Sequence, residues 1–165
     1  MKIDLFSTTC FEHKTNSFGI EDNQPAVAVE FEEGTAKVDN ADRLSIYFVP
    51  IDKNFFCYKA NGKDEESLCD ALLICVRPPG KYDFYFVELK SIQKSNASKG
   101  LEQLKSTIGI FKTDYPALLS CISKKTAFYS NKKHPFFQYS HSEECERFRH
   151  ETGFRLVYCA TIPIK

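Results

Sequence analysis

Three residues in two neighbouring apolar segments have the types and the spacing to bind a divalent cation. Asp70 stands at the head of the apolar run 71–76, and Glu88 and Lys90 end the following run, 82–90, after a Pro-Pro-Gly turn. Successive side chains of a strand point to opposite faces, so Glu88 and Lys90 share one face. If the two runs pair as neighbouring strands, Asp70 lies beside them and two carboxylates converge. Paired carboxylates repel each other until a cation neutralises them, so the pattern predicts a hard divalent metal site with a lysine at its edge.

The same three residues also fit a simpler interpretation. Asp, Glu and Lys at strand ends are common as solvated residues at the rim of a sheet. Here, however, both segments are apolar on two faces, as in central strands that are covered on both sides. Burying an unpaired carboxylate or ammonium group at the end of such a strand is costly, so these groups need partners or a metal.

The stretch resembles the PD-(D/E)XK nuclease superfamily, also called restriction-endonuclease-like, over roughly residues 55–125. The motif of that family is an acid that opens one strand, (D/E)-x-K at the end of the next strand, and a following helix that often supplies a Gln. Asp70 matches the first acid and Glu88 the second. Lys90 matches the lysine and Gln103 the helical glutamine. The chain departs from the motif at Cys69, where the family often has Pro, a position that carries no chemistry.

The resemblance implies a metal-dependent nuclease that hydrolyses phosphodiester bonds. Asp70 and Glu88 would bind Mg²⁺ or Mn²⁺ through oxygen, with the Leu89 carbonyl as a backbone ligand. Lys90 would orient the attacking water and stabilise the negative charge that develops on the phosphate. The catalytic residues would then be Asp70, Glu88, Lys90 and Gln103. DNA is favoured over RNA as the substrate, and endonucleolytic cutting is the default expectation.

Gln103 belongs to a predicted amphipathic helix over residues 98–112. In a helical projection it lies roughly opposite the apolar stripe, on a polar face that it shares with Lys99 and Ser106. This position predicts a phosphate-facing or solvated Gln103 rather than a direct metal ligand. The apolar stripe, which must pack on the sheet, consists of Leu101, Leu104, Ile108 and Phe111.

Basic residues gather in the second half of the chain, although the net charge of the whole chain is zero. Residues 1–80 contain 8 Lys and Arg against 14 Asp and Glu, a net charge of −6, and residues 81–165 contain 14 against 8, a net charge of +6. Such an asymmetry indicates a face that binds polyanions, although an ordinary solvated surface explains the lysines equally well. The predicted nucleic-acid-binding residues are Lys94, Lys99, Lys105, Lys124, Lys125, Lys132 and Lys133.

The order of the predicted elements indicates an α/β fold, a three-layer sandwich with a central mixed β-sheet flanked by helices, as the restriction-endonuclease-like resemblance also implies. The opening helix of that family has no clear counterpart. Residues 9–22 are the candidate, although Asn16, Ser17 and Gly19 make a poor helix interior. Apolar runs between turns predict strands at 26–32, 44–51, 54–60, 71–76, 82–90, 117–123, 126–130 and 154–160, and helices at 98–112 and 142–152.

A chain of 165 residues has the size of a single domain. We expect residues 1–53 to form a strand-rich N-terminal extension, residues 54–130 to carry the motif, and residues 131–165 to add a C-terminal helix and strand. No apolar segment approaches the roughly 20 residues needed to cross a bilayer, and no signal peptide is evident. We therefore expect a cytoplasmic protein without a membrane partner, in which the seven cysteines are reduced thiols.

Two other classes of function remain open. The chain could be a non-catalytic subunit on the same fold, in which the charged cluster is structural. It could also be an inhibitor-like interaction protein whose acidic N-terminal half occupies a basic partner protein. A nuclease of this size has little surface for reading sequence, so a homodimer or a partner subunit is expected to contribute specificity. Restriction, antiphage defence, repair and recombination are equally compatible settings.

Overall fold

The structure of the protein is a computed structural model, and it describes residues 11–13, 15–23, 25–30, 34–52, 54, 68–89, 97–131 and 142–165. In this part the chain forms ten strands and three helices. The strand predicted over residues 54–60 lies outside the described residues, except for Asn54. Four lysines of the predicted site are also outside them: Lys90, Lys94, Lys132 and Lys133.

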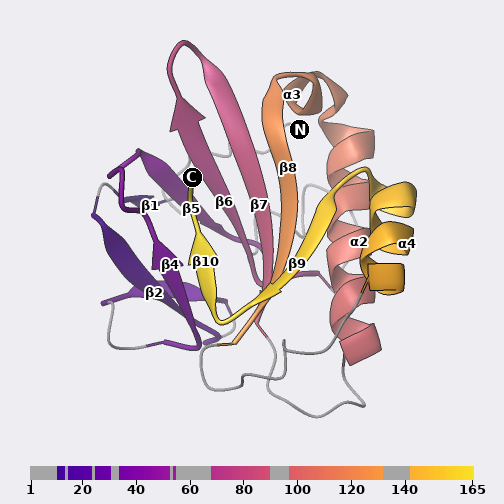
Figure 1. The fold of residues 1–165 in the computed structure, drawn as a ribbon, viewed down its shortest axis with the longest axis horizontal. Coiled ribbons are helices and arrows are strands. Elements are labelled where there is room, and N and C mark those ends of the chain that lie inside the picture. The colour runs from indigo at the N-terminus through magenta and orange to yellow at the C-terminus, as the bar shows by residue number, and fades with distance from the viewer. Residues whose placement is uncertain are drawn as a thin grey trace.

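A six-stranded mixed sheet forms the centre of the described part (Figure 1). Its strand order is β1-β5-β6-β7-β8-β9. Neighbours are antiparallel from β1 to β7, whereas β8 runs parallel to β7 and β9 parallel to β8. The turn at residues 78–80 joins β6 and β7 into a hairpin, as the sequence predicts. The strands are β1 (Phe11–His13), β5 (Ile46–Pro50), β6 (Ala71–Arg77), β7 (Lys81–Leu89), β8 (Ile122–Ser130) and β9 (Arg155–Cys159).

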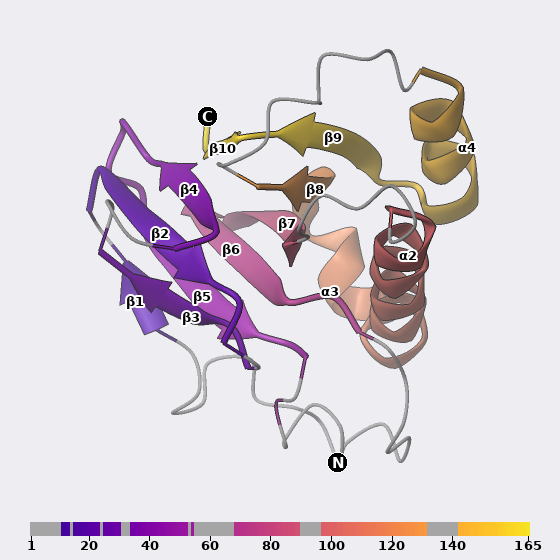
Figure 2. The same ribbon diagram turned by 90° about the horizontal axis from the view of Figure 1, so that it is seen from below.

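Two further layers cover the faces of the central sheet (Figure 2). Helices cover one face, and a four-stranded sheet of order β10-β4-β2-β3 covers the other. The C-terminal strand β10 pairs in parallel with β4, so it joins a layer otherwise built from the first forty residues. The predicted three-layer α/β sandwich around a mixed sheet is confirmed, with a second sheet as one outer layer. The additional elements are β2 (Ser17–Glu21), β3 (Val27–Val29), β4 (Ala36–Asp39), β10 (Thr161–Pro163), α2 (Ala97–Asp114), α3 (Pro116–Ser120) and α4 (Ser142–Thr152).

Alternating side chains of β7 hold the three layers together. Phe84 and Phe86 face the helices, and the ring of Phe86 meets that of Phe111 in α2 edge to face, with centroids 5.2 Å apart. Tyr85 and Val87 face the second sheet. All four β7 side chains are at most 3 % exposed. A strand that is covered on both faces reads as a continuous apolar run, which explains the sequence pattern of this segment.

The strand predicted over residues 117–123 is wrong. Helix α3 occupies most of this segment, and β8 begins only at Ile122, so the predicted strand 126–130 is the second half of a longer one. Pro116 lies in the first turn of α3, where its fixed φ and its missing N–H group are tolerated. The apolar residues after Pro116 therefore pack as a short helix rather than as a strand.

The helix considered for residues 9–22 is also wrong, because this segment contains β1 and β2. Phe18 and Ile20 are buried, and β2 pairs with both β3 and β4. Glu21 ends β2, a strand of the outer sheet. The helix predicted at 142–152 coincides with α4, and α2 extends the helix predicted at 98–112 slightly at both ends.

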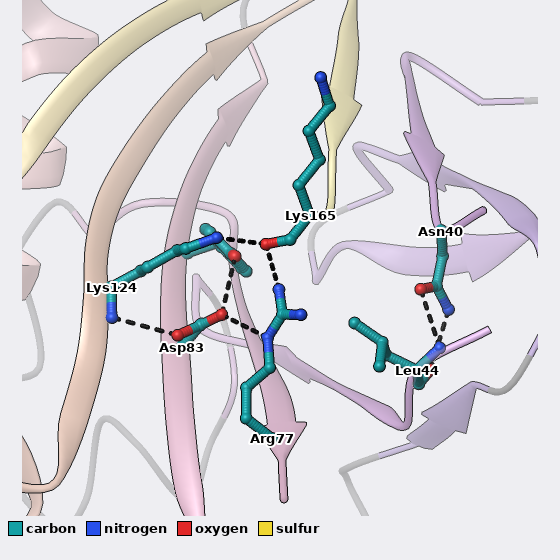
Figure 3. A network of polar contacts seen from close by, with 7 residues as sticks. Asn40, Leu44, Arg77, Asp83, Lys124 and Lys165 are labelled. Carbon is teal, nitrogen blue, oxygen red and sulfur yellow. Dashed lines mark hydrogen bonds and ion pairs between the residues drawn. The ribbon is translucent and has the colours of Figure 1, made fainter. Parts of the chain in front are cut away.

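A buried carboxylate joins three strands at the end of the central sheet that contains the β6–β7 turn (Figure 3). Asp83 is 1 % exposed, and its Oδ2 accepts hydrogen bonds from Arg77 Nε at 2.7 Å and from the Tyr85 hydroxyl at 3.3 Å. Its Oδ1 accepts a 3.1 Å bond from the backbone N–H of Lys124, at the position where the β7–β8 register shifts. The side chains of Arg77 and Lys124 also donate to the carbonyl oxygen of Lys165.

No helix in the described ranges has the length and apolar character that a membrane span requires. The described cysteines, Cys69, Cys75, Cys121, Cys145 and Cys159, are all free thiols.

Candidate metal centre

The pairing of β6 with β7 brings the two acids of the motif onto neighbouring strands. The register sets Ala71 against Val87, and one further step along both strands sets Asp70 opposite Glu88. Asp70 Oδ2 accepts a 2.6 Å hydrogen bond from the backbone N–H of Leu89, which ties its side chain to β7. Asp70 is 6 % exposed and Glu88 is fully buried. Two buried carboxylates therefore meet at one end of the central sheet.

Glu88 points from β7 toward the first turn of α2. A Cβ placed on Gly100 would lie 3.2 Å from Glu88 Cγ and 2.6 Å from Cε2 of Tyr129, the β8 residue that pairs with Glu88. Gly100 thus allows the helix to approach the strands more closely than a larger residue would. The N-terminus of a helix carries partial positive charge, and the first turn of α2 contains no acidic residue. The positive end of the helix therefore lies on the side of β7 that carries Glu88.

Gln103 lies on the sheet side of α2, so the prediction that it faces away from the sheet is wrong. Its side chain is 7 % exposed, and its Nε2 donates a 3.0 Å hydrogen bond to the carbonyl of Leu68. Among the described residues, no donor lies within hydrogen-bonding distance of Gln103 Oε1. A buried acceptor of this kind destabilises a fold by roughly 1–3 kcal/mol unless water or a ligand satisfies it. The Gln103 side chain is therefore held beside Leu68, two residues before Asp70.

Polar contacts widen the buried face of α2 beyond its apolar stripe. Thr107 Oγ1 accepts a 2.9 Å hydrogen bond from the backbone N–H of Cys69 and donates a 2.8 Å bond to the carbonyl of Gln103. These bonds fix the segment before Asp70 against the helix. Lys99 is exposed. The apolar stripe itself is buried as predicted, at Leu101, Leu104, Ile108 and Phe111.

Two neighbouring side chains respond to the charge of the carboxylates. Burial raises the pKa of the Cys69 thiol well above its ordinary value; a hydrogen bond with Thr107 lowers it, and Glu88 and Asp70 raise it further. Burial also raises the pKa of the Tyr129 hydroxyl, and the charge of Glu88 is the next largest cause. The thiol and the phenol therefore stay protonated at neutral pH. The candidate ligands of the centre are therefore its two carboxyl groups rather than the thiol or the phenol.

The donors gathered here suit a hard cation. Asp70 and Glu88 offer carboxylate oxygens, and Gln103 offers an amide oxygen. In the described part of the chain, no group of three or more His, Cys, Asp or Glu side chains is arranged to hold a metal. Mg²⁺ is commonly held by only one or two carboxylates, while water and substrate phosphates complete its shell. The donor set therefore fits Mg²⁺ or Mn²⁺ better than Zn²⁺, whose protein sites mostly use Cys and His.

Two of the predicted site residues follow Glu88 directly. Leu89, whose carbonyl is the predicted backbone ligand, is the last residue of β7. Lys90 lies outside the described residues, so its role stays a prediction.

The sequence analysis missed Gly100 and Thr107, which set the position of α2. The available signals were a glycine near the start of a helix and a threonine inside it. Both residue types are unfavourable in helices, so each usually occurs there because of close packing or a hydrogen bond.

The predicted nucleic-acid-binding lysines that are described lie at separate places. The ammonium group of Lys105 contacts Glu151 of α4 at 2.6 Å and Glu102 at 3.3 Å, so this lysine joins two helices. Lys124 donates to the Lys165 carbonyl at the far end of the sheet, and Lys125 lines an open depression there. The role predicted for Lys105 is not supported by its contacts, because two carboxylates already neutralise its charge.

Replacing Gly100 with Ala should disturb the centre, whereas the same change at Gly109 should not. The new methyl group at position 100 would meet the Tyr129 ring at 2.6 Å. We expect overpacking of roughly 1–3 kcal/mol to exceed the gain of about 1 kcal/mol in helix propensity. Gly109 is exposed with nothing within 4 Å of an added Cβ, so its variant should be more stable. Urea unfolding and Mn²⁺ titration of both variants test this; equal stabilisation by both changes would contradict the close approach of α2.

Comparison of the chain with protein-family models, with curated proteins and with solved structures found no match. The resemblance to PD-(D/E)XK nucleases therefore depends on the motif residues of the sequence alone.

Proposed function

We propose that this protein is a metal-dependent phosphodiesterase that cleaves nucleic acid, with DNA favoured over RNA and internal bonds as the point of attack. The observation that carries the proposal is the hydrogen bond from Leu89 N–H to Asp70 Oδ2, which locks one buried acid beside the strand that carries the other. A solvated salt bridge at the rim of a sheet has no need of such an arrangement. It suits a cation site, because the ligands must be held together despite their repulsion.

Each residue of the centre has a physical task in this proposal. Asp70 and Glu88 would hold Mg²⁺ or Mn²⁺, with Gln103 Oε1 and the Leu89 carbonyl as additional oxygen donors. When bound, such a cation neutralises phosphate charge and lowers the pKa of water in its shell. Lys90, two residues after Glu88, would position the attacking water and stabilise the developing negative charge. Gly100 would keep the positive end of α2 close to the carboxylates.

The proposal is tested by titrating Mg²⁺ and Mn²⁺ into the purified protein by calorimetry, and by incubating it with plasmid, linear and single-stranded DNA and with RNA in the same buffers. Asp70→Asn is the informative variant. Asp114→Asn is its matched control, because Asp114 is exposed at the far end of α2. Metal binding and cleavage that are lost in Asp70→Asn alone would support the nuclease. No metal binding by the wild type would contradict it.

Metal binding without cleavage would indicate a missing partner subunit or the wrong substrate, whereas the non-catalytic subunit, in which the cluster is structural, would not bind the metal. A homodimer or a partner subunit would supply a second centre for the second strand of a duplex, and gel filtration with and without DNA tests this. Lys105→Met is a useful control in these binding assays, because Lys105 is engaged by Glu151 and Glu102. We expect the Lys105→Met variant to bind DNA with unchanged affinity.

A further inference from the structure

An open depression lies at the end of β8 that is remote from the carboxylates. It has a volume of about 730 Å³. Strand β8, the end of helix α4 and the start of β9 all contribute to its wall. The lining residues are Ile122, Ser123, Lys125, Arg149, Gly153 and Arg155.

Three cations and no carboxylate from the described residues line this depression. Lys125 comes from β8, Arg149 from the last turn of α4, and Arg155 from the first position of β9. Within the described residues, none of the three side chains forms an ion pair, whereas Lys105 and Arg77 do. A cation at a helix C-terminus is favoured by the helix dipole, which accounts for Arg149. Lys125 and Arg155 lie on strands, so that explanation does not extend to them.

The depression is separate from the candidate metal centre. The β7–β8 register pairs Lys125 with Phe84 and Tyr129 with Glu88, so four residues of β8 separate the two places. At a strand rise of about 3.3 Å per residue, this is a distance of roughly 13 Å along the sheet. Arg155 pairs with Thr126 on the other side of β8, next to the level of Lys125. The three cations come from neighbouring elements and line this one depression.

We propose that this depression binds phosphate groups, and that it does so independently of the metal centre. Arginine offers several N–H donors in a planar fork that matches two oxygens of a phosphate, and lysine adds a point charge. Ser123 contributes a hydroxyl group to the wall. Phosphates of a nucleic acid backbone and a small phosphorylated ligand present the same chemistry. The experiment distinguishes these two sources.

The test compares wild type with the double variant Arg149→Ala/Arg155→Ala and with Lys125→Ala. Arg147→Ala is the matched control, because Arg147 is an exposed arginine of the same helix outside the depression. The probes are a short fluorescent DNA duplex, followed by anisotropy in EDTA, and inorganic pyrophosphate, followed by calorimetry. We expect the double variant to bind at least one probe more than tenfold more weakly. For DNA, the slope of log K against log salt concentration should also become shallower by about 0.9 for each phosphate that the variant no longer neutralises.

Loss of affinity for DNA alone would identify backbone phosphates as the ligand, and loss of affinity for pyrophosphate would identify a small phosphorylated ligand. Unchanged affinity for both probes in the double variant, or equal weakening by Arg147→Ala, would overturn the proposal. Arg149→Lys/Arg155→Lys retains the charge, so partial recovery of binding in that variant excludes misfolding as the cause. Asp70→Asn should bind both probes normally. An absence of nuclease activity therefore leaves this proposal intact. Likewise, an absence of phosphate binding in the depression leaves the proposed nuclease intact.

Discussion

DNA cleavage should fall by about a thousandfold when Asp70 is replaced by Asn, a loss at the upper end of what removal of one charge-stabilising group produces. Glu88→Gln and Lys90→Ala should cause losses of similar size. The three variants should differ in metal binding, however. The two carboxylate changes should abolish it, whereas Lys90→Ala should leave it nearly intact, since an ammonium group repels a cation rather than binding it.

The fold should survive the Asp70→Asn change. The side-chain oxygen of an asparagine can still accept the hydrogen bond from Leu89 N–H, which spans 2.6 Å to Asp70 Oδ2. What disappears is one of the two carboxyl groups that would hold the metal. Thermal unfolding should therefore show a small change, while calorimetry with Mn²⁺ shows a large one. Equal activity in the wild type and in all three variants would exclude Asp70, Glu88 and Lys90 as the catalytic site.

The part of the fold closest to the motif was predictable because its signals are local. The runs that became β6 and β7 are apolar on both faces and are joined by a short turn, so their pairing needed no knowledge of distant residues. Helix α4 has acidic residues in its first turn, basic residues in its last turn and Gly153 directly after it. These are ordinary helix boundary signals. The register of one hairpin then placed Asp70 opposite Glu88.

The outer sheet was not predictable in the same way. Its strands have three to five residues each, too short for a periodic pattern. Its pairing of β10 with β4 joins residues more than a hundred positions apart. The position of Gln103 was missed for a related reason. The apolar stripe of α2 indicates one side of the helix. Gly100, which packs closely on β8, and Thr107, which accepts a hydrogen bond from Cys69, extend the buried face of the helix toward the side that carries Gln103.

Asp83→Ala should have the largest effect on stability that we expect from a single polar substitution. The change removes a buried acceptor that three donors share: Arg77 Nε, the Tyr85 hydroxyl and the backbone N–H of Lys124. Truncating one partner of a buried charge pair typically destabilises a protein by about 3–5 kcal/mol. Arg77 keeps 24 % of its side chain exposed, so water offsets part of the loss. We therefore expect about 3 kcal/mol by urea unfolding.

A double-mutant cycle separates the charge pair from the other interactions of Asp83. Arg77→Met alone leaves the carboxylate buried with two neutral donors, so it should also destabilise the protein. In the double variant no charge is stranded, and the total loss should be smaller than the sum of the two single losses by about 1–3 kcal/mol. Additive losses would show that Arg77 and Asp83 act independently.

The backbone donor explains why the double variant should still fall short of the wild type. Lys124 N–H lies where the β7–β8 register shifts, and Asp83 Oδ1 supplies the acceptor at that position. Asp83→Asn retains one oxygen for this bond and should therefore lose less stability than Asp83→Ala. Lys81→Met, an exposed change on the same strand, controls for the loss of a charge alone. If Asp83→Asn and Asp83→Ala were equally destabilised, the charge pair would be the main contribution of Asp83 and the hydrogen bond at the register shift a minor one.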